Sequence, residues 1–324
     1  MQNYLIKRLL LMIPMLIGVT IISFTIMNLA PGDPAMMYVD LEREAPTPEL
    51  LAEIRTRIGL DKPLLVRYFI WLKGVVTGDL GYSMATRQPV LREILSRIGT
   101  TMKISFLSIL LSFTLGMTIG TYCALKQYKF VDYFLSVLAF IGLSLPAFWF
   151  AMIIILVFTN TLGWLPSVGL SDVYLVNPTP VEAFIDRVKH LIMPVFALSL
   201  SSIGSWARYQ RSSFLEVINQ DYIRTARSKG LDETTITLRH ALRNSALPII
   251  TILGMTLPQL IGGAFIIESI FGLPGMGRLG ITAILRRDYP MVMGVTLLSS
   301  IMVLLGTFIS DILYAVVDPR IRYN

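Results

Sequence analysis

The chain has 324 residues, of which 54% are hydrophobic and 15% are charged, and its mean hydropathy is +0.66. Because soluble domains carry about 25% charged residues, this composition excludes a soluble enzyme and indicates a membrane protein. The formal net charge is +7, and the single cysteine, Cys123, with only two histidines, excludes a disulfide-rich scaffold and gives no ligand set for a zinc module.

Six segments are apolar enough to be candidates for membrane spans. A bilayer core about 30 Å thick requires about 20 apolar residues in a helix. The fourth segment has 17 residues and is rich in serine, and the sixth contains one charged residue, Asp311. We therefore expect an all-α integral membrane protein with six transmembrane helices. In chain order the segments are Leu9–Leu29, Ile104–Leu125, Tyr133–Phe158, Leu191–Ala207, Ala246–Ile267 and Pro290–Val317.

The distribution of basic residues predicts the orientation of these spans. The first span is longer than the apolar region of a typical signal peptide and is followed by a poor cleavage site, so we expect an uncleaved anchor. With the N-terminus inside, the four inside segments carry 13 basic residues and the two short outside loops carry five. By the positive-inside rule we expect both termini in the cytoplasm.

The segment after the first span is too polar to cross a membrane and too regular in its pattern to be disordered. Its apolar residues recur at helical spacing, which predicts a small helical domain on the outer face. We expect helices from Thr47 to about Gly59, over Leu64–Thr77 and from Pro89 to Ile98. The chain then divides into residues 1–30 (N-terminus and first span), 31–103 (extracytoplasmic helical cap) and 104–324 (five-helix core with a cytoplasmic loop, 208–245).

The sequence contains no pattern typical of an enzyme, a nucleotide site or a metal site. His190 and His240 have no cysteine or carboxylate at metal-ligand spacing, so we interpret both as structural. Glycine is never followed by Lys-Ser or Lys-Thr, which excludes a Walker A loop. The glycine-rich segment Phe271–Arg278 is interpreted as a tight re-entrant turn. We expect no catalytic residue, no metal and no cofactor bound by this chain.

Polar and small residues within the last two spans are candidates for lining a transport pathway. A charge inside a span needs a partner, so Asp311 is either a pathway group or half of a packing ion pair near the cytoplasmic rim. In the fifth span, small residues, a proline and a glutamine indicate either a pathway or close helix packing. These residues are Gly254, Pro258, Gln259, Gly262 and Gly263.

The most informative segment is the cytoplasmic loop 208–245. Leu215, Ile218, Tyr222 and Ala226 recur at helical spacing, which predicts one apolar stripe. Gly230 then ends the helix and Asp232 is placed to cap a second one. Such a pair of short helices fits either an anionic lipid surface or a groove on a soluble partner. Small Ala226 within the stripe favours close approach to another protein.

This loop carries a resemblance to a known family. The run Asp221 to Leu231, with Arg239 to Asn244 beyond it, resembles the coupling loop of the B-type permease subunit of dipeptide, oligopeptide and nickel ABC importers. The likeness extends along most of the chain, through segments 30–34, 78–83, 268–277 and 318–320. It implies that the ATPase-coupling residues are Asp221, Tyr222, Arg224, Thr225, Ala226, Arg227, Gly230 and Leu231.

The resemblance implies the fold, partners and cargo of a type I ABC importer permease in the bacterial cytoplasmic (inner) membrane. Expected partners are a homologous permease subunit in a heterodimer, two ATPase subunits that bind ATP and Mg, and an extracytoplasmic substrate-binding protein. The expected cargo is di- or oligopeptides. Two alternatives stay open from the sequence: a self-sufficient carrier or channel for small solutes, and an importer of nickel or another solute within the same family.

Overall fold

The computed structural model describes residues 2–29, 35–36, 47–57, 59–256 and 265–317, and in these ranges the only strand-like pairing is one bridge between Tyr82 and Pro89. The helices are α1 (Gln2–Leu29), α2 (Pro48–Arg57), α3 (Leu64–Thr77), α4 (Val90–Leu125), α5 (Phe130–Ser144), α6 (Ala147–Ile155), α7 (Pro180–Ile218), α8 (Asp221–Ser228), α9 (Glu233–Thr235), α10 (Arg243–Met255), α11 (Phe265–Ile270), α12 (Met276–Leu285) and α13 (Tyr289–Val317). Two π-helical segments, Leu156–Thr161 and Ile236–Leu242, follow α6 and α9.

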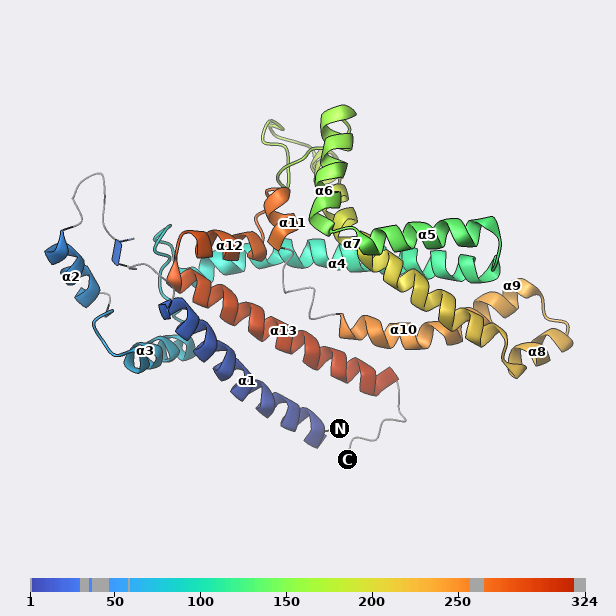
Figure 1. Cartoon of the computed structure of the whole chain (residues 1–324), viewed down its shortest axis with the longest axis horizontal. Coiled ribbons are helices and arrows are strands. Elements are labelled where there is room, and N and C mark those ends of the chain that lie inside the picture. The colour runs from blue at the N-terminus through green and yellow to red at the C-terminus, as the bar shows by residue number, and fades with distance from the viewer. Residues whose placement is uncertain (1, 30–34, 37–46, 58, 257–264, 318–324) are drawn as a thin grey trace.

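The molecule is an elongated helical bundle. Figure 1 shows α2 and α3 at one end, α8 and α9 at the other, and α4 and α7 extending through the middle. Among the residues that the structure describes, four helices contain a segment long and apolar enough to cross a membrane. They belong to the first, second, fourth and sixth expected spans, and the serine-rich fourth span is the middle of the 39-residue helix α7.

The third expected span, Tyr133–Phe158, is not one continuous helix. It forms α5 and α6, which meet at an angle of 105°. The break falls at Leu145, whose extended backbone precedes Pro146, a residue that has no N–H to continue the helix ladder. The fifth expected span is described only at its ends, as α10 and α11, so the count of six spans stays a prediction.

The central pair α4 and α7 packs closely because small residues lie at the contact. A Cβ atom on Gly116 would lie 2.3 Å from the Cβ of Trp206, and one on Gly120 would lie 2.4 Å from the carbonyl oxygen of Ala207. Without a hydrophobic driving force between helices in lipid, such close backbone approach supplies the van der Waals contact that holds spans together. Helix α7 therefore serves as the central element against which α4 and α5 pack.

The segment after the first span packs on the ends of α1, α4 and α13 that lie far from α8 (Figure 1). Tyr68 of α3 is buried against Phe24 and Met293. Asp288, just before α13, is buried and accepts hydrogen bonds from the Ser83 hydroxyl and from the backbone N–H groups of residues 84, 85 and 291. The expected third cap helix is the start of α4, which continues unbroken past residue 103. The cap boundary at that residue stays a prediction.

Candidate coupling site

Helices α8 and α9 form a short helix–turn–helix beyond the end of α7. Gly230 has φ +76°, a left-handed conformation that glycine adopts without steric cost. The Leu231 N–H donates to the Ala226 carbonyl at 3.4 Å and the Gly230 N–H donates to the Arg227 carbonyl at 2.9 Å, which closes the end of α8. The Asp232 side chain accepts from the Thr235 N–H at 2.9 Å. The helix end and cap predicted from the sequence are confirmed.

The buried face of α8 differs from the predicted stripe. Ile223 and Ala226 are buried with Phe214 of α7 and with Ile236 and Ala241 of the following π-helical segment. Ala226 therefore packs within this chain, and the close approach of another protein to this helix stays a prediction. Tyr222, the other member of the stripe on α8, is 43% exposed, and its hydroxyl accepts from the Asn244 side chain at 3.1 Å.

The exposed surface of the helix–turn–helix carries the remaining predicted coupling residues, which we call the coupling face. It is made of Asp221, Tyr222, Arg224, Thr225, Arg227, Gly230 and Leu231. Arg227 bridges the turn, because its guanidinium donates to both carboxylate oxygens of Glu233, at 2.8 and 3.2 Å. This guanidinium holds the pKa of the Glu233 carboxyl below its ordinary value. An exposed ion pair thus bridges the turn within the coupling face.

A polar cluster at the base of the loop joins three helices. Gln210 of α7 is fully buried, and its side-chain amide donates to the hydroxyls of Thr121 on α4, at 2.9 Å, and Ser245 on α10, at 3.1 Å. The Ser213 hydroxyl donates to the Ser245 carbonyl at 2.9 Å. These bonds hold α10, which begins directly after the loop, against α7.

A buried ion pair joins α7 to α5. Arg211 donates two hydrogen bonds of 2.8 Å to the two carboxylate oxygens of Asp132, and the Tyr128 N–H donates to the same carboxylate. Asp132 is 2% exposed. Sequence analysis missed this pair because its members are 79 residues apart, although an aspartate beside an apolar span was a visible signal.

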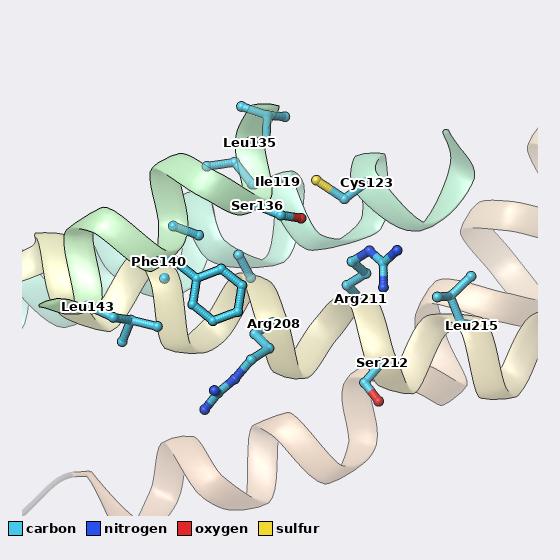
Figure 2. Close-up of a pocket in the computed structure, with 13 residues that line it drawn as sticks. Ile119, Cys123, Leu135, Ser136, Phe140, Leu143, Arg208, Arg211, Ser212 and Leu215 are labelled. Carbon is cyan, nitrogen blue, oxygen red and sulfur yellow. The ribbon is translucent and has the colours of Figure 1, made fainter. Parts of the chain in front are cut away.

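A cavity of about 360 Å³ lies beside this pair, between α4, α5 and α7. Figure 2 shows Arg211 on the side of α7 near Cys123, whereas Arg208 extends away from α4. Cys123 is buried and is the one cysteine of the chain. The cavity leaves space between α5 and α7 at the end of the bundle that carries the loop.

The predicted pathway residues are only partly described. Gly254 of α10 faces α13, where a Cβ atom would lie 3.5 Å from the Ser310 hydroxyl oxygen. Asp311 accepts a hydrogen bond of 2.6 Å from the Arg8 guanidinium, which joins α13 to α1. The Gly254 contact fits close helix packing, and the Arg8–Asp311 bond fits a packing ion pair, the two alternatives to a pathway role. Pro258, Gln259, Gly262 and Gly263 lie outside the described residues.

Two other sequence interpretations can be compared with the structure. His190 has a carboxylate neighbour that the sequence analysis overlooked, since its Nδ1 lies 3.2 Å from Asp186 and 2.8 Å from the carbonyl oxygen of the same residue. No group of three metal-ligating side chains occurs among the described residues. The glycine-rich turn after α11 is held by buried Glu268, which accepts from the Thr101 hydroxyl at 2.7 Å and from the Arg278 N–H at 3.0 Å.

Apolar helices around a central helix pair, with a helix–turn–helix at one end, are the features of a multi-pass membrane protein. The chain belongs to the family described as "Binding-protein-dependent transport system inner membrane component", which it matches over residues 116–323. Residues 1–105 match the N-terminal family of the same transport systems.

Relatives and solved structures agree with this assignment. The chain is 41% identical, over the full length of both chains, to the oligopeptide transport system permease protein AppB of Bacillus subtilis. It is 36% identical, also over the full length of both, to the dipeptide transport system permease protein DppB of Alkalihalophilus pseudofirmus. The fold resembles the inward-facing methionine ABC transporter MetNI, with a TM-score of 0.51 and 17% identity over 69% of this chain and 96% of that one.

Proposed function

We propose that this chain is the permease subunit of an ATP-driven importer that moves di- or oligopeptides across the bacterial cytoplasmic membrane. The observation that carries the proposal is the coupling face, which projects from the bundle yet is fixed to α7 and α10. Membership of the binding-protein-dependent family supports the importer assignment, and the names of the oligopeptide and dipeptide relatives support the cargo.

The coupling face connects to the spans through its buried side. Ile223 and Ala226 pack against Phe214 at the end of α7 and against the segment that leads into α10. When an ATPase subunit moves against the exposed side, close-packed interiors of this kind transmit the motion as a rigid body. Tilting of α7 and α10 then changes which side of the membrane the pathway faces.

The proposal includes partners and an orientation. One chain of this size supplies half of a pathway, so we propose a heterodimer with a homologous permease. Two ATPase subunits would bind on the side of the coupling face, and a substrate-binding protein would bind at the opposite end. The excess of basic residues in the inside segments supports a cytoplasmic coupling face and cytoplasmic termini. The pathway assignment of Pro258, Gln259, Gly262 and Gly263 stays part of the proposal. For Gly254 and Asp311 the pathway assignment stays the alternative to the packing contacts described above.

Reconstitution of the complete complex tests the function. We expect proteoliposomes that contain both permeases, the ATPases and the binding protein to accumulate a labelled tripeptide only when ATP is available to the ATPases. Nickel offered in place of the tripeptide should not accumulate. Uptake of the tripeptide by this chain alone, without ATPases, would support the carrier alternative and contradict the proposal.

A further inference from the structure

A second cavity, which we call the cap pocket, lies at the end of the molecule far from α8. It has a volume of about 480 Å³ and opens between the last turns of α1, the helices α2 and α3, and the start of α13. Figure 1 shows α1 and α3 side by side at this end, at the edge of the bundle. The floor of the pocket is apolar and includes Phe24, Met27 and Met293 from the two spans.

The wall of the cap pocket carries excess positive charge. Arg57, Lys62 and Arg67 line it, with Asp79 as the one acidic residue among its lining residues. The Asp79 carboxylate accepts from the Gly81 N–H at 2.9 Å. The side chains of the three basic residues make no hydrogen bond or ion pair with any residue that the structure describes. The described lining of the pocket therefore holds three cations and one carboxylate, an excess of positive charge.

A half-buried guanidinium and a buried indole N–H in the pocket point to an acceptor beyond those that the described residues provide. Arg67 is half-buried, and this burial lowers the pKa of its guanidinium below the ordinary value. The indole Nε1–H of Trp71 is buried and has no acceptor among the described residues. Buried donors in proteins are nearly always hydrogen-bonded, so a donor such as this one requires a ligand or water. A phosphate oxygen accepts from both a guanidinium and an indole.

The position of the pocket indicates the source of that phosphate. Helix α1 is a peripheral span, since only 11% of its apolar window is buried, and Ile22 and Ile26 are 60% and 62% exposed. Aromatic and cationic side chains at the end of a span lie at the depth of lipid headgroups. A lipid there can place its phosphate among the cations and its acyl chains along the exposed side of α1.

We propose that the cap pocket binds the headgroup of an anionic phospholipid from the membrane leaflet on the cap side. The phosphate would contact Arg57, Lys62 and Arg67 and accept the Trp71 indole hydrogen bond. Bound lipid would then fill the space between α1 and α3 and hold the cap on the spans. This site is separate from the coupling face and does not require the proposed transport activity.

Binding of defined lipids to the purified full-length chain tests the proposal. Native mass spectrometry would compare phosphatidylglycerol with phosphatidylcholine, and brominated phosphatidylglycerol would report proximity to tryptophan through fluorescence quenching. We expect a preference for phosphatidylglycerol that falls about fivefold in each of Lys62→Gln and Arg67→Gln, the effect of removing one basic residue near an anionic surface. Trp71→Phe should remove most of the fluorescence quenching that brominated phosphatidylglycerol causes.

The matched control is Lys73→Gln, which removes a cation from the exposed side of α3 without changing the pocket. It should leave the lipid preference unchanged, and size-exclusion profiles should show that all variants remain folded. Equal binding of the two lipids, or equal effects of Lys62→Gln and Lys73→Gln, would overturn the proposal. Displacement of phosphatidylglycerol by millimolar inorganic phosphate would also overturn it, because the pocket would then be a site for a free anion.

Discussion

At the residue scale, the Asp132–Arg211 pair is the interaction whose loss we expect to cost most. Removing one partner of a buried pair leaves an uncompensated charge and costs about 3–5 kcal/mol. Because the Arg211 side chain is 30% exposed, we expect Asp132→Asn to lower the free energy of unfolding by only about 2–3 kcal/mol. The measurement is the melting temperature in detergent, which should fall by several degrees.

The surface pair between Asp221 and Arg224 provides the control for this prediction. Its atoms lie 3.6 Å apart and its side chains are 95% and 75% exposed. Such pairs contribute little, about 0–1 kcal/mol, because water screens them. Asp221→Asn should therefore leave the melting temperature unchanged. A similar shift for both variants would show that burial of the Asp132 pair has no energetic role.

Residues whose role depends on local sequence could be predicted, and residues whose role depends on distant neighbours could not. The left-handed Gly230 and the capping Asp232 were correct because a helix end is defined within a few residues. The predicted stripe included Ala226 correctly but also included exposed Tyr222 and omitted buried Ile223, because the residues that bury this face come from α7 and from the segment after α9. Arg211 and Asp132 share no sequence spacing.

At the scale of the element, substitutions at Gly230 can distinguish backbone strain in the turn from a steric clash with a partner subunit. Any other residue there is strained by the positive φ, at about 1–2 kcal/mol. A Cβ atom added at Gly230 meets no atom of this chain within 4 Å. Gly230→Ala and Gly230→Leu therefore share the backbone strain, and only leucine adds volume outward from the coupling face.

We expect Gly230→Leu to reduce ATP-driven uptake at least tenfold while Gly230→Ala retains most of it. The physical reason is a clash between the leucine side chain and the groove of an ATPase subunit. Co-purification of the ATPases with each variant provides the second measurement, and membrane insertion of both variants provides the control. Equal uptake by the two variants would mean that no partner lies close to this turn.

Helices were predicted correctly where apolar residues recur at helical spacing and turn or cap residues mark the helix ends. Helix α3 begins and ends at the expected residues, and α8 ends before Gly230 as expected. The start of α8 at Asp221 was not predicted, because the expected apolar stripe ran from Leu215 to Ala226 through the break after Ile218. The break between α5 and α6 was missed because hydropathy continues through it, although the Leu145–Pro146 step was a visible signal. The length of α7 was underestimated because its polar ends extend beyond the apolar window.

At the scale of the whole molecule, the arrangement of spans predicts which parts of the chain share one side of the membrane. The coupling face and the cap lie at opposite ends of the bundle (Figure 1). Basic residues gather in the segments on the side of the coupling face, and translocation of such segments is disfavoured. The cap is then expected outside and the coupling face inside, an orientation that charge counting predicts without any contact information.

Cysteine labelling on either side of the membrane checks this orientation. We expect a membrane-impermeant maleimide to label Thr77→Cys, on exposed α3, in spheroplasts, and to label Thr225→Cys, on exposed α8, only in inverted vesicles. The unmutated protein is the control, because buried Cys123, 3% exposed, should react in neither preparation. Labelling of Thr225→Cys in sealed spheroplasts would reverse the orientation. The coupling face would then lie on the side without ATP, where no ATPase could act on α7 and α10.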